Sequence, residues 1–152
     1  MTTSVETASP DQTRALGRCL GAALRPGDLV ALEGELGSGK TVLVQGIAQG
    51  MGVVDQVHSP TFVLHHRYRG AVPLDHYDLY RLRGLDWADA GLDEPAPDAV
   101  SVVEWSERAA PLEDWARVRI RLDVVDPSRR RLTCVRGTER VKACFDGQLP
   151  RA

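Results

Sequence analysis

Cysteine is scarce in this chain of 152 residues. Cys19, Cys134 and Cys144 are the only three, and their spacing fits neither a disulfide framework nor a zinc-binding motif. A scattered and odd-numbered set of this kind indicates reduced thiols in a reducing cytosol, either core thiols or incidental ones. No disulfide-linked partner is expected.

Long apolar runs are missing as well. No segment approaches the roughly 20 residues that a helix needs to cross a bilayer, and the first residues, MTTSVETASPDQ, lack the pattern of a signal peptide. The formal net charge is −2, so no overall positive field attracts nucleic acid. These absences predict a cytoplasmic protein without a membrane partner.

Basic residues gather in two places, but neither place has the aromatic residues of a nucleic-acid surface. Over residues 117–122, arginines alternate with apolar residues, which predicts the solvated face of an edge strand. Arg129, Arg130 and Arg131 follow a DPS sequence that is typical of a hairpin turn. The four histidines likewise lack the spacing of metal ligands.

Lysine is the rarer basic residue, since Lys40 and Lys142 are the only two among nineteen. Lys40 lies in GELGSGKT, residues 34–41, which has the G-x-x-x-x-G-K-[ST] pattern of a P-loop. The glycines let backbone N–H groups approach phosphate oxygens. Lys40 brings a charge to the outer phosphates and Thr41 a hydroxyl ligand for Mg²⁺. An apolar strand before the loop and helical spacing after it complete the prediction of a triphosphate site.

The remaining segments predict a mixed α/β layout in one domain over residues 1–152. Ser9, Pro10 and Gln12 form a capping signal, so a helix is expected over about 9–25. FVLHHRY with AVPLDHYDLYRL, and ARVRIRLDVV with RRLTCVRG, are predicted as two antiparallel hairpins. VSVVEW is predicted as a buried strand, GLDWADAGLDEPAPDA as a short helix with a loop, and residues 141–145 as a short strand or turn.

Phosphate transfer also needs an acid near Mg²⁺ and a group that positions the nucleophile. The VSVVEW strand ends at Glu104, at the carboxyl end where ligands of α/β sheets gather. In LDHYDLYRL, Asp75 and Asp78 would lie on opposite faces of a strand, so at most one of them faces the nucleotide. Thr61 of HSPTF is a loop hydroxyl that could sense the γ-phosphate, or it simply belongs to a turn.

The motifs GELGSGKT, SPTF, HYDLYRL, GLDE and VVEWSE occur in this order. With them the chain resembles the bacterial TsaE (YjeE) family of small ATPases of tRNA threonylcarbamoyladenosine biosynthesis, over about residues 9–125. The resemblance implies a three-layer fold like that of P-loop NTPases, whose mixed sheet has a parallel core and antiparallel hairpins. It also implies ATP and Mg²⁺ as cofactors, weak hydrolysis by the protein alone, and TsaD and TsaB as partners that give indirect access to tRNA.

The resemblance assigns roles to individual residues. Catalysis is assigned to Glu104, Lys40 and Thr61, and contact with Mg²⁺ to Thr41, Asp78 and Glu104. Contact with the nucleotide is assigned to Glu35, Leu36, Gly37, Ser38, Gly39, Lys40, Thr41, Val42 and Trp105.

Two positions depart from the family pattern. Val42 replaces a second threonine, which removes a side-chain hydrogen bond to the α-phosphate, and Ser106 follows the glutamate–tryptophan pair where the family often has proline. Three other functions stay open: a small-molecule P-loop kinase, a nucleotide-binding module without hydrolysis, and a GTPase. The absence of an N-K-x-D guanine-reading motif favours ATP over GTP.

Overall fold

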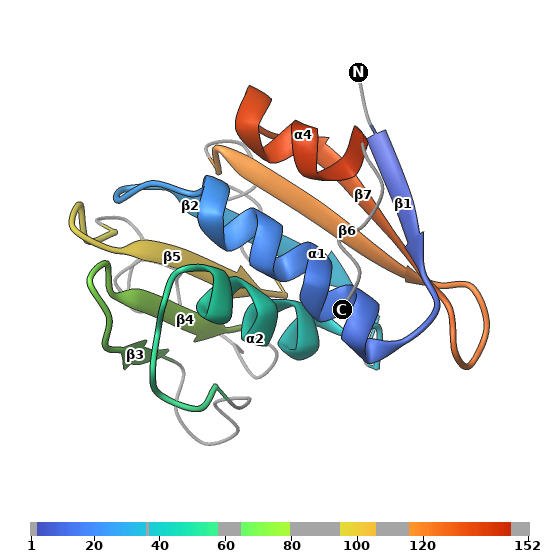
Figure 1. Cartoon of the computed structure of the whole chain (residues 1–152), viewed down its shortest axis with the longest axis horizontal. Helices are drawn as coiled ribbons and strands as arrows, with labels where there is room; N and C mark the ends of the chain where they lie inside the picture. Colours follow the sequence, from blue (N-terminus) through green and yellow to red (C-terminus); the bar gives the residue numbers. More distant parts are fainter. Residues whose placement is uncertain (1–2, 36, 58–64, 80–94, 106–115, 147–152) are drawn as a thin grey trace.

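The computed structural model describes residues 3–35, 37–57, 65–79, 95–105 and 116–146. These residues form one seven-stranded sheet with helices packed on it (Figure 1). The strands are β1 (Thr3–Thr7), β2 (Leu29–Gly34), β3 (His65–Tyr68), β4 (Leu74–Asp78), β5 (Val100–Glu104), β6 (Val118–Val124) and β7 (Arg130–Arg136). The helices are α1 (Pro10–Ala23), α2 (Lys40–Gly50) and α4 (Glu139–Asp146).

The sheet has a parallel core with antiparallel strands on both sides. Its strand order is β1-β7-β6-β2-β5-β4-β3. Strand β2 runs parallel to both of its neighbours, β5 and β6, and β4 runs parallel to β5. The hairpins β3–β4 and β6–β7 are antiparallel. The predicted mixed α/β sheet and both predicted hairpins are therefore confirmed, and the carboxyl ends of four parallel strands meet at one edge.

Both faces of the central strands are buried. On one face, Val30 and Val102 join the cluster that contains Leu43 and Ile47 of α2; Figure 1 shows α1, α2 and α4 on the same side of the sheet. On the other face, Val103 is buried in a second cluster. A strand that is buried on both faces is mostly apolar, as in the LVAL and VSVV segments of β2 and β5. None of the described helices is long and apolar enough to cross a membrane.

Helix α1 begins where the capping signal places it. Ser9 is the N-cap, Pro10 begins the helix, and the Ser9 hydroxyl accepts a hydrogen bond from the Gln12 N–H at 3.2 Å. The Gln12 side chain accepts a second bond from the Ala8 N–H at 2.7 Å. The Ser9 hydroxyl thus satisfies a donor of the first helical turn, and the Gln12 side chain satisfies a backbone donor just before the helix.

Glycines bring α1 and α2 into close contact. Gly17 faces Gly46, and Gly21 faces Gly50, so the two helices run in the same direction. A Cβ atom added to Gly21 would lie 2.2 Å from the Ile47 carbonyl oxygen, which is far inside van der Waals contact. Gly17 and Gly21 are four residues apart in α1, as Gly46 and Gly50 are in α2. This spacing is the signal in the sequence, since residues four apart share one helix face.

Three predictions about the outer elements are wrong or incomplete. Strand β6 is not an edge strand, because β7 and β1 extend the sheet beyond it. Its alternation instead separates a buried face, with Ile120 and Leu122, from a polar face where Arg119 lies 3.7 Å from Glu33. Residues 139–146 form helix α4 rather than a strand or turn. Strand β1 was not predicted.

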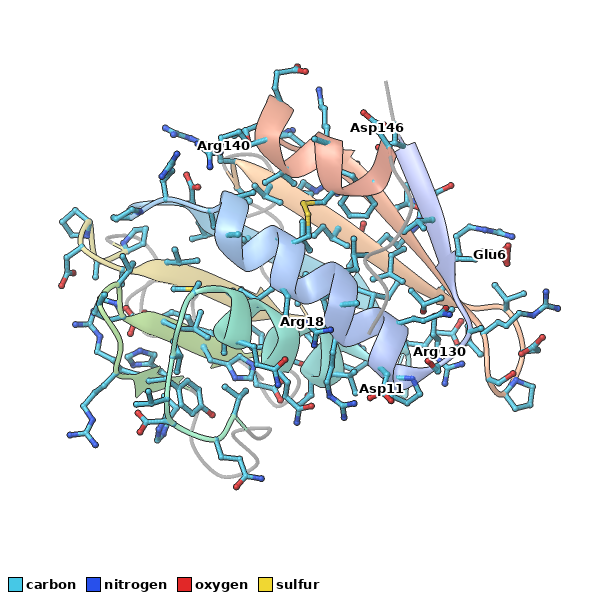
Figure 2. The ribbon with its side chains drawn as sticks, in the orientation of Figure 1. Glu6, Asp11, Arg18, Arg130, Arg140 and Asp146 are labelled. Atoms are coloured by element: carbon cyan, nitrogen blue, oxygen red, sulfur yellow. A yellow bond between two sulfur atoms is a disulfide. The ribbon has the colours of Figure 1, made fainter. Side chains whose placement is uncertain are left out.

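The prediction that all three cysteines are free thiols is also wrong. Cys19 and Cys144 form a disulfide that spans a sequence separation of 125, with their Cα atoms 5.9 Å apart. Figure 2 shows this sulfur–sulfur bond in yellow, between α1 and α4. Cys134 remains a free thiol, and burial raises its pKa.

Candidate nucleotide-binding site

The P-loop lies at the carboxyl edge of the sheet, between β2 and α2. Gly37 and Gly39 have φ angles of +80° and +101°, a region that favours glycine because a Cβ atom is strained there. A Cβ atom at either position would have no neighbour within 4 Å, so backbone conformation rather than space requires glycine. Gly39 is the N-cap of α2, and the unpaired N–H groups of this first turn form a favourable place for an anion.

Lys40 is folded back over the loop that contains it. Its Nζ donates hydrogen bonds to the carbonyl oxygens of Gly34 at 2.5 Å and Glu35 at 3.0 Å. The same ammonium group lies 3.7 Å from the centre of the Trp105 ring, in a cation–π contact. The structure therefore brings together two residues that were assigned to nucleotide binding from distant parts of the sequence.

Two of the residues that were assigned to contact with Mg²⁺ also lie close together. The Thr41 hydroxyl lies 3.3 Å from both carboxylate oxygens of Glu104. Asp78 is in register with Glu104 on the neighbouring parallel strand β4, so it ends its strand at the same edge. A hydroxyl and two carboxylates are the hard oxygen donors that Mg²⁺ prefers, and these three residues therefore fit the ion.

Asp75 lies on the opposite face of β4, as its odd spacing from Asp78 predicts. Its carboxylate accepts hydrogen bonds from Arg67 at 2.8 and 2.9 Å and from His65 at 2.9 Å. Burial alone would raise the pKa of Asp75, but the hydrogen bonds from Arg67 and His65 outweigh it and hold the pKa below its usual value. The geometry thus leaves Asp78 as the aspartate of this strand that lies beside Glu104.

His76 is a buried neighbour of Glu104 that the sequence interpretation did not identify. Its Nε2 forms a hydrogen bond with the Glu104 carboxylate, and the two side chains are 0% and 4% exposed. The signal in the sequence was the two-residue spacing between His76 and Asp78, which places both on the same face of a strand.

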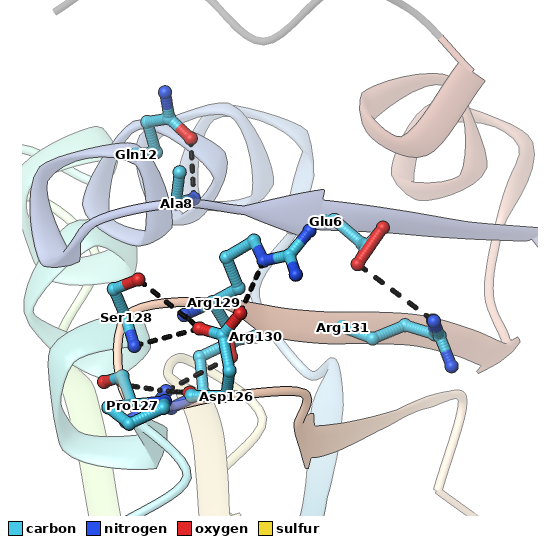
Figure 3. Close-up of polar contacts among 9 residues, drawn as sticks. All are labelled: Glu6, Ala8, Gln12, Asp126, Pro127, Ser128, Arg129, Arg130 and Arg131. Carbon is cyan, nitrogen blue, oxygen red and sulfur yellow. Dashed lines mark hydrogen bonds and ion pairs between the residues drawn. The ribbon is translucent and has the colours of Figure 1, made fainter.

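The β6–β7 turn reaches the P-loop as well. Arg130 Nη2 donates to the Gly37 carbonyl oxygen at 3.2 Å, while its Nη1 donates to carbonyl oxygens within the turn. Figure 3 shows the Asp126 carboxylate accepting hydrogen bonds from Ser128 and Arg129 at the centre of the turn. The hydrogen bond from Arg129 is the main reason why the pKa of Asp126 falls to about 2. The turn is thus ordered by its own residues and linked to the loop by Arg130.

The other assigned residues fall into two groups. Ser38 is fully buried, and within the described residues its hydroxyl has no hydrogen-bond partner, while Val42 is half-buried in the first turn of α2. Leu36 and Thr61 lie outside the described residues, so their assigned roles stay predictions.

A parallel strand, a glycine-rich loop ending in lysine and threonine, and a helix at the carboxyl edge of the sheet define an α/β protein of the P-loop class. A family model described as threonylcarbamoyl adenosine biosynthesis protein TsaE matches residues 7–132. The chain belongs to the TsaE family, and the resemblance drawn from its motifs is confirmed.

Individual relatives agree with this assignment. A protein of Streptomyces coelicolor named tRNA threonylcarbamoyladenosine biosynthesis protein TsaE is 48% identical over 115 residues, which cover 72% of this chain and 78% of the relative. A protein of the same name from Treponema pallidum is 39% identical over 127 residues, or 82% of this chain and 94% of the relative. The crystal structure of Bacillus subtilis YdiB matches with a TM-score of 0.73 and 29% identity, over 95% of this chain and 91% of that one.

Proposed function

We propose that this protein binds ATP with Mg²⁺ and hydrolyses the ATP in the cytoplasm, as a component of the machinery that forms tRNA threonylcarbamoyladenosine next to the anticodon. It acts with the TsaD and TsaB proteins, which stimulate a weak intrinsic activity and through which it reaches tRNA. The observation that carries this proposal is the 3.3 Å contact between Thr41 of the P-loop and Glu104 at the end of β5. The names of the relatives support the pathway.

Each side chain of the site has a defined task in the proposed reaction. The N–H groups at the start of α2 hold phosphate oxygens, and Lys40 exchanges its two carbonyl acceptors for phosphate oxygens of higher charge. Thr41, Asp78 and Glu104 would hold Mg²⁺, which supplies neutralising charge to the phosphates when bound. Glu104 also accepts a hydrogen bond from the attacking water and so directs its lone pair at the γ-phosphorus.

Transfer of the phosphoryl group to water breaks the bond between the γ-phosphorus and the bridging oxygen, and it releases ADP and phosphate. Charge develops on the phosphoryl oxygens and on the leaving oxygen as that bond breaks, so the Lys40 ammonium stabilises the transition state more than the bound substrate. Thr61, which precedes β3 in the sequence, is proposed to sense the γ-phosphate.

Phosphate release from ATP with Mg²⁺, measured with and without the TsaB–TsaD pair, tests this proposal. We expect measurable ATP binding, slow release by the protein alone and at least about ten-fold stimulation by the pair. The variant Glu104→Gln should bind ATP but release phosphate far more slowly than the wild type, at a residual rate that stays measurable, whereas Glu139→Gln, a surface glutamate of α4, should behave as the wild type. Intact binding without stimulation would contradict the partner assignment, and a phosphorylated small molecule would favour a kinase instead.

A further inference from the structure

We infer that His76 is a positioning residue that holds the Glu104 carboxylate in the orientation required for hydrolysis. This inference rests on the proposed ATPase function. It adds to the site a residue of β4 that acts through its hydrogen bond with Glu104.

The register of the central strands explains how His76 reaches Glu104. On β4, His76 pairs with Val102 of β5, and Asp78 pairs with Glu104. His76 therefore lies diagonally from Glu104 on the same face of the sheet, within reach of a long side chain. The carboxylate offers only acceptors, so the Nε2 atom of His76 carries the proton and donates it.

The two partners of the Glu104 carboxylate within the described residues differ in strength. The Thr41 hydroxyl lies 3.3 Å from each oxygen, which is longer than the roughly 2.5–3.0 Å typical of O–H···O bonds. The bond from His76 involves a single oxygen, Oε2, and both residues are buried. In the proposed function Thr41 turns to Mg²⁺, so among the described side chains His76 remains the hydrogen-bond partner that orients the Glu104 carboxylate.

The surroundings of His76 also indicate that its role is to position Glu104. Its Nδ1 atom is buried and has no hydrogen-bond partner in the described part of the chain. The ring is otherwise packed near Tyr68, with 6.3 Å between ring centres. A phenylalanine would fill such a place without leaving a buried nitrogen unpaired, so packing alone does not account for the imidazole. The hydrogen bond with Glu104, which is its polar contact within the described residues, does account for it.

A histidine–carboxylate pair between β3 and β4 provides a control. His65 of β3 lies 2.9 Å from Asp75, but this pair occupies the opposite face of β4. Its loss removes a histidine–carboxylate hydrogen bond between β3 and β4 but leaves the His76–Glu104 contact between β4 and β5 in place.

The kinetic test compares His76→Phe, His76→Gln and the control His65→Phe, with wild-type protein and the partner pair present. For His76→Phe we expect kcat to fall about 10- to 100-fold, as is typical when a supporting hydrogen bond in a site is removed, while the Kd of Mg²⁺–ATP stays within about two-fold. Because glutamine keeps a side-chain donor, His76→Gln should recover part of kcat. His65→Phe should leave kcat within about two-fold of the wild type.

A double-mutant cycle separates positioning from a general structural role. If His76 acts through Glu104, adding His76→Phe to Glu104→Gln should cause no further loss of kcat. Losses that multiply, or a His76→Phe variant that binds ATP more weakly while keeping kcat, would overturn the inference.

One measurement tests the contact without any ATPase activity. Two-bond ¹H–¹⁵N correlation spectra of the histidine rings should show His76 with its proton on Nε2 in the wild type, and its signals should shift in Glu104→Gln and stay in place in Asp75→Asn. An Nε2 atom without a proton would overturn the inference, whatever the activity. Wild-type protein that neither binds nor hydrolyses ATP but shows the expected signals would contradict the proposed function and leave the His76–Glu104 contact standing.

Discussion

The ammonium group of Lys40 is 3.7 Å from the centre of the Trp105 ring and donates to the Gly34 and Glu35 carbonyl oxygens. Trp105 holds its position with a φ angle of +62°, which costs about 1 kcal/mol or more for a residue other than glycine. The charge of Lys40 is thus satisfied by contacts within the protein. Only a more highly charged acceptor would draw it away.

Lys40→Ala should weaken the binding of Mg²⁺–ATP about 10- to 100-fold, because charge-assisted hydrogen bonds contribute about 1.5–3 kcal/mol each. Titration calorimetry measures the affinity directly. The other lysine, Lys142, lies in α4 and is partly exposed, so Lys142→Ala is the matched control and should bind ATP as the wild type does. Equal affinities for the two variants would show that the P-loop lysine does not contact phosphate.

Because α1 and α2 approach closely, the sign of the stability change in Gly21→Ala distinguishes helix propensity from overpacking. Helix propensity alone would make Gly21→Ala stabilising by about 1 kcal/mol. The added Cβ atom would lie 2.2 Å from the Ile47 carbonyl oxygen, and overpacking of this kind typically costs about 1–3 kcal/mol. We therefore expect Gly21→Ala to lower the free energy of unfolding in urea.

The neighbouring exposed position supplies the control for this prediction. Ala22 lies on the solvent side of α1, so Ala22→Gly should show the ordinary propensity cost of about 1 kcal/mol. A stabilised Gly21→Ala variant would mean that the helices do not approach each other as closely as the structure describes.

Local signals in the sequence were sufficient for some elements and not for others. The Ser9 cap and the glycine loop before Lys40 are each specified by residues close together in the chain, and their structures follow the prediction. The place of β6 inside the sheet depends on β1 and β7, which its own alternation does not reveal. Helix α4 was missed although Val141, Cys144 and Phe145 have helical spacing.

Contacts between distant residues were the hardest to predict. The Cys19–Cys144 disulfide spans 125 residues, and spacing alone carries no information about such a pair. The His76–Glu104 contact needed the register of β4 against β5, which tertiary structure sets. A motif names candidate residues for a site, but only the fold shows which side chains hold those residues in place.

The disulfide predicts a stability that depends on the redox state. A crosslink across a loop of this length stabilises a protein by about 2–5 kcal/mol, chiefly by restricting the unfolded chain. Reduction, or the variant Cys19→Ser, should therefore lower the Tm by several degrees. Cys19→Ser should itself be insensitive to reductant, which separates the bond from other effects of the reagent. An unchanged Tm on reduction of the wild type would contradict a stabilising crosslink.

Asp75 should make stability depend on pH. Its pKa is lowered in the folded protein, so its contribution to stability is present above about pH 4, near the pKa of an unfolded aspartate, and is lost as the pH falls through the folded pKa. Asp75→Asn should cost about 1–3 kcal/mol at pH 7, less than a fully buried pair because Arg67 is partly exposed. It should also flatten the loss of stability below pH 4 in urea unfolding. Asp98→Asn, which removes a carboxylate 3.8 Å from the same arginine, should do neither.

Arg130 should affect nucleotide binding although it lies 93 residues from the loop that it contacts. Its guanidinium fork donates to Gly37 through Nη2 and to the β6–β7 turn through Nη1, so one planar group fixes the turn and the P-loop relative to each other. Loss of such a hydrogen bond costs about 0.5–1.5 kcal/mol, and we expect Arg130→Ala to weaken ATP binding by roughly 2- to 10-fold. Arg130→Lys should recover little, because a single ammonium group does not provide two donors in a fixed geometry.

The variant Arg131→Ala distinguishes the loss of the Arg130–Gly37 contact from the loss of a positive charge. It follows Arg130 directly, points to the other face of β7, and lies 3.9 Å from Glu6 (Figure 3). Charge attraction to ATP changes about equally in the two variants, whereas only Arg130→Ala removes the contact with Gly37. Equal affinities for Arg130→Ala and Arg131→Ala, both below the wild type, would assign the effect to charge. An affinity lowered in Arg130→Ala alone would show that the turn keeps the loop in the conformation that receives phosphate.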